Sequence, residues 1–167
     1  MATIDCTGVA TREINAAIRS AIAAGDREIT LENTAARHNL AVAVLDPVRI
    51  RCHGSVGYFC GGLIDGPSIE IAGSAGWGLA ESMMGGEVRV LGSAGNGAAA
   101  AIRGGTVVIH GDAAARLGVS MKGGLALVAE TDRFVAIATE EVAIRAALEG
   151  DYRAREAGAR EVRVWRR

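Results

Sequence analysis

The sequence predicts a mainly β protein: a single-stranded β-helix, or β-solenoid, of 19-residue coils, flanked by an N-terminal helix and a C-terminal helical tail. Three observations predict this fold. A glycine motif recurs every 19 residues, a second glycine motif recurs twelve residues into each unit, and a short apolar alternation follows each second motif. Since 167 residues is about the length of one domain, we expect 1–167 to fold as a single domain.

The first predicted element is a helix over 11–24. Thr11 can cap its N-terminus and Gly25 is placed to end it. One face of this helix is apolar, at the spacing i, i+4, i+8, because it carries Ile14, Ile18 and Ile22. A solenoid has two open ends that expose core and unpaired strand edges, so we expect this helix to cap one of them.

Solenoid coils are expected over 27–128, beginning with a lead-in strand at 27–32. The first glycine motif marks one corner of each coil, at Gly54 and Gly57, Gly73 and Gly76, Gly92 and Gly95, and Gly111. The second marks another corner, where a turn needs a positive or preset φ, at Gly66-Pro67, Gly85-Gly86, Gly104-Gly105 and Gly123-Gly124.

One strand follows the second corner of each coil. Its apolar alternation has the period of two that is typical of a half-buried strand, at 68–71, 87–90, 106–109 and 125–128. An apolar column precedes this corner, at Ile64, Met83, Ile102 and Met121, and extending the register backward adds Leu45. Coils stacked about 4.8 Å apart would bury these columns in one continuous core.

The register is lost beyond Val128, and a helical or irregular C-terminal cap is expected over 139–167. Its apolar residues Val142, Ile144 and Leu148 predict a helix that ends at Gly150. The last residues predict a charged helix followed by a short strand at 162–164.

The composition fits narrow coils and disfavours several classes of partner. The chain is 50% hydrophobic but only 4% aromatic, with 23 Gly, so the core must be built from small and β-branched side chains. A net charge of −1 provides no field to attract nucleic acid or an anionic membrane. No basic-then-apolar leader and no membrane-spanning apolar run is present, and the three cysteines have no paired spacing. We therefore expect a cytoplasmic protein with reduced thiols.

The residues give no catalytic, cofactor-binding or metal site. The segments 73–78 and 92–97 are similar to phosphate-binding loops, but they recur as corners without the strand-loop-helix context that such loops need. His53 and His110 share one position in the unit, yet three stacking distances, about 14 Å, separate them. We therefore predict that the repeated glycines serve turn geometry alone.

One column of the predicted sheet suggests a docking face. On the outer side, charged residues give way to apolar ones in the order Arg51, Glu70, Arg89, Val108 and Leu127. Val108 and Leu127 need a cover, which is either the helix around 142–148 or a partner subunit. Along another edge acidic residues give way to basic ones, in the order Asp46, Asp65, Met84, Arg103 and Lys122.

These repeats resemble the glycine-rich (GXGXG) β-helix domain at the C-terminus of the glutamate synthase large subunit. The resemblance covers about 27–128 and is carried by 54–62, 73–86, 102–111 and 120–124. Within this group the chain looks most like the stand-alone β-helix subunit of N-methylglutamate synthase. It departs from the family pattern after Val128, where the family's solenoid continues with further glycine coils.

The resemblance implies a non-catalytic scaffold subunit of an amidotransferase-type complex. A glutaminase-type subunit and an FMN-binding synthase subunit would be its partners, and the FMN and the iron–sulfur cluster would be bound by a partner. Two alternatives stay open. One is the β-helix subunit of a formylmethanofuran dehydrogenase or formyltransferase-type complex, and the other is a free-standing ligand-binding solenoid.

Overall fold

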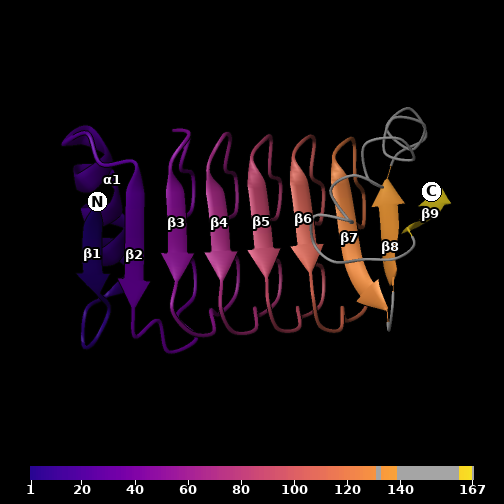
Figure 1. Cartoon of the computed structure of the whole chain (residues 1–167), viewed down its shortest axis with the longest axis horizontal. Helices are drawn as coiled ribbons and strands as arrows, with labels where there is room; N and C mark the ends of the chain where they lie inside the picture. Colours follow the sequence, from indigo (N-terminus) through magenta and orange to yellow (C-terminus); the bar gives the residue numbers. More distant parts are fainter. Residues whose placement is uncertain (131–132, 139–161, 167) are drawn as a thin grey trace.

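The computed structural model describes residues 1–130, 133–138 and 162–166, with side chains up to Ala129. Within these ranges the chain forms a parallel β-solenoid (Figure 1). Seven strands stack in parallel in chain order: β1 (Ala2–Asp5), β2 (Glu28–Glu32), β3 (Arg49–Cys52), β4 (Ser68–Ile71), β5 (Glu87–Val90), β6 (Thr106–Ile109) and β7 (Leu125–Glu130). The predicted mainly β solenoid is therefore confirmed.

The 19-residue register holds from β3 to β7. Ile50 pairs with Ile69, Ile69 with Val88 and Val88 with Val107. A second, shorter parallel ladder joins the first corners through Val56, Ala75, Ala94 and Ala113. We call the segments between successive strands the first coil (33–48), the second coil (53–67) and the third coil (72–86).

The first coil departs from the predicted register, because Glu28 pairs with Arg49, 21 residues further on, which is two residues more than the repeat. One of these two extra residues lies at the Leu45–Pro47 corner, where the Val48 N–H bonds to the Asp46 carbonyl at 2.8 Å. The apolar column ahead of the second corner is therefore continued by Val44, which is 4% exposed, whereas Leu45 is 61% exposed. The placement of Leu45 in that column was wrong.

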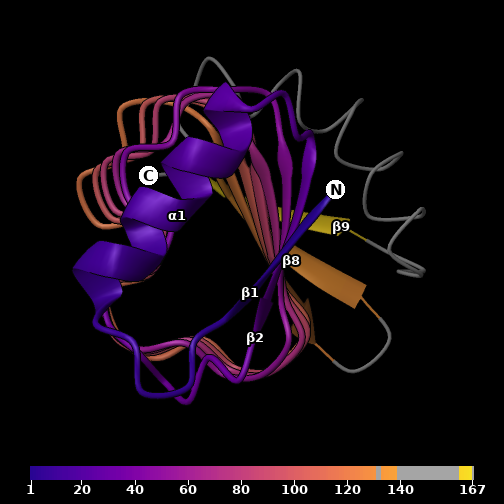
Figure 2. The same ribbon diagram turned by 90° about the vertical axis from the view of Figure 1, so that its left-hand side faces the viewer.

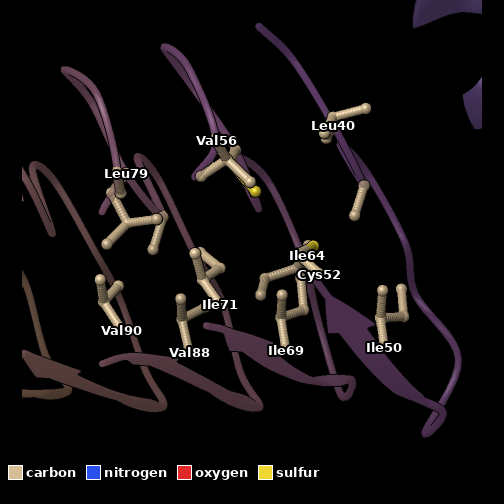
Figure 3. Packing of buried hydrophobic residues seen from close by; sticks show 14 of the residues in the cluster. Leu40, Ile50, Cys52, Val56, Ile64, Ile69, Ile71, Leu79, Val88 and Val90 are labelled. Carbon is tan, nitrogen blue, oxygen red and sulfur yellow. The ribbon is translucent and has the colours of Figure 1, made fainter. Parts of the chain in front are cut away.

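The interior is filled by inward columns from the strands and coils (Figure 3). Ile50, Ile69 and Val88 form one such column, and Cys52, Ile71 and Val90 form the next, all buried. Full burial of one such aliphatic side chain contributes about 1.5–3 kcal/mol. The predicted core of small and β-branched residues is confirmed by these columns.

Left-handed residues alternate along each coil between the two corners. In the second coil Phe59, Gly61 and Leu63 have φ of 56°, 65° and 58°. The alternation turns successive amides in opposite directions, so the N–H groups of Phe59 and Leu63 bond to the third coil and that of Gly61 bonds to the first coil. The coil backbone is thereby hydrogen-bonded to both neighbours without forming a regular strand.

The N-terminal end is closed by α1 (Thr11–Ala23), which lies across the open end of the coil in Figure 2. Ile14 and Ile18 are buried against the core. The Asn15 amide donates to the Asn39 carbonyl at 2.7 Å and accepts from the Ala41 N–H at 2.9 Å, so it satisfies backbone groups of the first coil. The predicted helix at this end is confirmed, and its contacts are those of a cap.

The ends of α1 differ from one another. Thr11 is not the N-cap, because the extended residue Ala10 takes that position and accepts the N–H groups of Glu13 and Ile14. At the other end Gly25 has φ 94° and bonds to Ile22, while Asp26 bonds to Ala21. These two bonds form a Schellman motif, as a glycine at that position predicts.

The solenoid path ends at β7, which turns back into β8 (Arg133–Ala138) as an antiparallel neighbour, and β9 (Val162–Arg166) pairs in parallel with β8. In Figure 1 β8 and β9 continue the row of strands beyond β7. The loss of register after Val128 and the strand at 162–164 are confirmed. The helix predicted around 142–150 and most of the predicted cap at 139–167 lie outside the described residues.

Candidate functional site

The repeated glycines lie where neighbouring coils approach most closely. A Cβ at Gly104 would lie 2.3 Å from the Met84 carbonyl oxygen, and one at Gly76 would lie 2.7 Å from the Gly57 carbonyl carbon. The second glycine of each Gly-Gly corner also has a positive φ, as at Gly105 (80°) and Gly124 (76°). Close backbone contact, more than φ, is what excludes a side chain at most of these corners.

The two residues of the predicted docking face, Val108 and Leu127, are buried within the chain, at 3% and 0% exposed. Thr106 and Leu125, which share their outward direction on β6 and β7, are buried as well. The structure therefore favours coverage by the chain itself over an open docking face here. The covering helix expected around 142–148 lies outside the described residues.

The histidines lie apart and pair with charged neighbours. His53 Nδ1 lies 2.8 Å from a carboxylate oxygen of Glu32, and His110 Nε2 lies 3.4 Å from an Arg89 guanidinium nitrogen. Burial and, to a lesser degree, the Arg89 charge lower the pKa of His110. Among the described residues no three histidine, cysteine or acidic side chains are grouped as metal ligands would be.

The side chains of Cys52, in β3, and Cys60, in the second coil, meet in the interior of the solenoid. Their side chains share a hydrogen bond, which together with burial raises the pKa of Cys52 well above its ordinary value. Cys6, Cys52 and Cys60 are free and buried. Because all three side chains are buried in the apolar interior, these cysteines are core residues.

An aromatic stack on the outside of the coils is a feature that sequence reasoning missed. The His38 and Tyr58 rings stack with centroids 4.5 Å apart, and the Tyr58 and Trp77 rings with centroids 5.2 Å apart. The His38 ring is fixed because its Nδ1 accepts the Tyr58 N–H at 2.8 Å. These rings occupy the same point of three successive coils, so the stack follows the solenoid axis.

Exposed apolar side chains extend this stack into a patch. Tyr58, Phe59, Leu63 and Trp77 are between 41% and 55% exposed, and we call them the aromatic patch. Half of the chain's two Trp, two Tyr and two Phe residues belong to it. The sequence does carry a signal for the stack, because Tyr58 and Trp77 are 19 residues apart. Both residues lie within the glycine-rich segments, whose glycines alone define the repeat.

A pocket of about 250 Å³ opens beside the aromatic patch. Its walls come from three coils: Asn39 and Val42, then Phe59 and Leu63, then Glu81 and Ser82. In the described part of the chain, the Glu81 carboxylate has no hydrogen bond or ion pair. The pocket thus combines apolar walls with one unpaired negative charge.

A second, more open pocket of about 440 Å³ lies between α1 and the first coil. Two arginines, Arg19 and Arg27, and one acidic residue, Asp46, border it together with apolar residues that include Ile22, Val44 and Leu45. The Arg27 guanidinium already donates to the carbonyls of Ile22 and Asp26, at 3.5 and 3.3 Å.

The stacked coils define a β-solenoid protein with an exposed aromatic patch on its N-terminal coils. Compared with known proteins, the chain matches no family model and no solved structure. It is 42% identical over 73 residues to Protein GlxC of Rhizobium meliloti (strain 1021). That match covers 42% of this chain and 32% of GlxC, so it spans about a third of that relative. No helix of the described residues has the length and apolarity that crossing a bilayer requires.

Proposed function

We propose that this chain is a non-catalytic structural subunit of a glutamate synthase-like complex of the N-methylglutamate synthase type. It would hold together a glutaminase-type subunit and an FMN-binding synthase subunit, and the FMN and the iron–sulfur cluster would be bound by the latter or another partner. The glycine motifs that resemble the glutamate synthase β-helix domain support this family, and the partial match to GlxC shows that related sequence occurs in a curated bacterial protein.

The observation that carries a docking role is the aromatic patch. Tyr58, Phe59, Leu63 and Trp77 stay half exposed, and they bring three aromatic rings together on two neighbouring coils. Clustered apolar groups of this kind mark binding sites, and Trp and Tyr dominate the energetics of protein interfaces. The neighbouring pocket is smaller than the roughly 300–1,000 Å³ typical of small-molecule sites, which favours a protein partner.

Co-expression tests the proposal. The chain is produced with an affinity tag in its native host, together with glutaminase-like and FMN-synthase-like chains from the same genome, and the mass of the purified species is measured by light scattering. We expect a yellow complex that contains all the chains in fixed ratio. A persistent free monomer, with every one of those chains present and folded, would contradict the proposal. A tagged, unrelated soluble protein serves as the control for nonspecific capture.

The second pocket favours an alternative function, a free-standing ligand-binding solenoid. Its size falls within the small-molecule range, and Arg19 and Arg27 beside apolar side chains suit a carboxylate with a short apolar tail. Thermal unfolding of the isolated chain with a series of C4–C10 carboxylic acids tests this function. A concentration-dependent rise in Tm that Arg19→Gln abolishes would favour it over the scaffold.

A further inference from the structure

We propose that the pocket beside the aromatic patch receives an arginine side chain from a partner protein. This inference rests on the proposed function, because it names the chemistry by which a partner subunit docks. The pocket offers three things that a guanidinium group uses: an aromatic face, a carboxylate and an apolar wall for its methylene stem.

The aromatic ring and the carboxylate converge on one point. The Phe59 ring and the Glu81 carboxylate both lie against Gly78, since a Cβ built there would be 2.7 Å from the ring and 3.0 Å from Glu81 Oε2. Both groups also line the pocket, so a planar guanidinium in the pocket can stack on the ring while it donates to the carboxylate. An ammonium group can form the ion pair but cannot stack, which favours arginine over lysine.

Glu81 is available for such a pair. Its carboxylate has no partner in the described part of the chain, whereas Glu28 faces Arg49, Glu87 faces Arg89, and Glu32 faces His53. No lysine or arginine is among the residues that line the pocket, and the Arg37 guanidinium of the first coil donates to the Cys6 carbonyl at 2.6 Å. The pocket therefore lacks a positive charge of its own.

Phe59 points to a surface role for the same position. It adopts φ 56°, a left-handed conformation that costs a bulky residue about 1–2 kcal/mol, and the same place in the next two coils is held by Gly78 and Gly97. The strain is not offset by burial, since the ring stays 44% exposed. At Gly78 and Gly97 the equivalent position carries no side chain, whereas at Phe59 it places an aromatic ring in the wall of the pocket.

The charge around the pocket favours a cationic partner. Asp46 and Asp65 are exposed at the corners of the first and second coils, close along the chain to Val42 and Leu63. The basic residues of the same edge, Arg103 and Lys122, lie in later coils. Asp46 shares the second pocket with Arg19 and Arg27, so among the residues that line the pocket beside the aromatic patch Glu81 alone carries a charge, and that charge is negative.

The test measures association of the full chain with the co-expressed glutaminase-like and FMN-synthase-like chains. We expect Glu81→Gln to weaken the complex about 10- to 100-fold, and the affinity of the variant to depend less on salt between 50 and 500 mM NaCl than that of the wild type. Glu70→Gln, which removes an exposed carboxylate from the outer face of β4, is the matched control and should bind as the wild type does. Thermal unfolding of both variants checks that the fold is unchanged.

A second measurement identifies the occupant. A photo-reactive phenylalanine derivative replacing Leu63 is cross-linked in the complex, and the attached peptide is sequenced. We expect the cross-linked partner peptide to contain an arginine. Replacing that arginine by glutamate should weaken the complex, and Glu81→Arg in this chain should restore it.

The outcomes separate the two proposals. A wild-type chain that forms no complex overturns the proposed function. A complex that forms but is equally stable with Glu81→Gln and Glu70→Gln overturns the arginine pocket alone. Cross-linking to a peptide without arginine, or to a second copy of this chain, overturns it as well.

Discussion

The hydroxyl oxygen of Ser55 accepts a hydrogen bond from the backbone N–H of Ser74 at 3.0 Å. The same contact repeats along the solenoid axis, from the Ser93 N–H to Ser74 at 3.1 Å and from the Asp112 N–H to Ser93 at 3.0 Å. Each serine therefore caps an amide of the next coil at the first corner. The repeat places a side-chain hydrogen bond where the backbone ladder alone does not satisfy that N–H.

Removal of one serine from this series should weaken the stack measurably. Ser74→Ala leaves the Ser93 N–H without its side-chain acceptor, and we expect a loss of about 0.5–1 kcal/mol in the free energy of unfolding, since water replaces the bond in part. Urea denaturation followed by circular dichroism measures it. Ser68→Ala, at an exposed strand start, is the control and should change stability by less than about 0.5 kcal/mol.

Close approach between coils makes Gly104 far less tolerant than Gly97. A Cβ at Gly104 would lie 2.3 Å from the Met84 carbonyl oxygen, whereas one at Gly97 meets nothing within 4 Å and carries only the cost of φ 70°. We expect Gly104→Ala to destabilise by about 3 kcal/mol and Gly97→Ala by about 1 kcal/mol. Chemical denaturation of both variants checks the order. Equal losses would mean that φ, not contact with the next coil, decides which corners need glycine.

Substitution of alanine by glycine should affect stability differently where the alanine has a positive φ and where it lies in a helix. Ala101 has φ 55°, so Ala101→Gly removes strain that offsets the added entropy of the unfolded chain, and stability should be unchanged or rise by up to about 1 kcal/mol. Ala16 lies exposed in α1, and Ala16→Gly should cost about 1 kcal/mol. A loss of equal size in both variants would contradict the left-handed conformation of Ala101.

The strands were predictable because their signal is a repeat. The alternation at Ser68, Ile69, Glu70 and Ile71 recurs every 19 residues, and the structure has β4 to β6 at the predicted positions. β1 has no counterpart in the repeat, since α1 replaces the coil that follows it, and four residues alone give too short a pattern. β8 was missed for a similar reason, because an antiparallel return leaves the 19-residue period.

The candidate site could not be predicted in the same way. Between the corners, alternate residues are left-handed, so neither a period of two nor one of 3.6 tells which side chains point outward. The exposure of Phe59 and Leu63 follows from that backbone and not from their hydrophobicity. The sequence shows which charged residues share a column on the regular strands. It does not show that Val108 and Leu127 are buried, because the position of a residue in the repeat gives its direction on the strand and not what covers it.

The extra residue at the Leu45–Pro47 corner makes two neighbouring residues unequal. Val44 is buried in the apolar column and Leu45 faces solvent. We expect Val44→Ala to cost about 2 kcal/mol through lost burial and the cavity it leaves, and Leu45→Ala to change stability by less than about 0.5 kcal/mol. Urea denaturation of the two variants measures the difference. If Leu45→Ala cost more stability than Val44→Ala, Leu45 would be the buried residue, and the 19-residue register would continue through this corner without interruption.

His110 should make the solenoid sensitive to mild acid. Burial and, secondarily, the Arg89 charge lower the pKa of His110 in the folded chain, while the unfolded chain keeps the ordinary value of about 6.5. Below pH 6.5 the unfolded state therefore binds more protons than the folded state, so the free energy of unfolding falls as the pH falls. We expect the wild type to lose more stability between pH 7 and pH 5 than His110→Gln does. Arg89→Met should retain most of this loss, because burial is the larger cause of the lowered pKa. Identical pH profiles for the wild type and His110→Gln would show that the histidine is equally easy to protonate in both states.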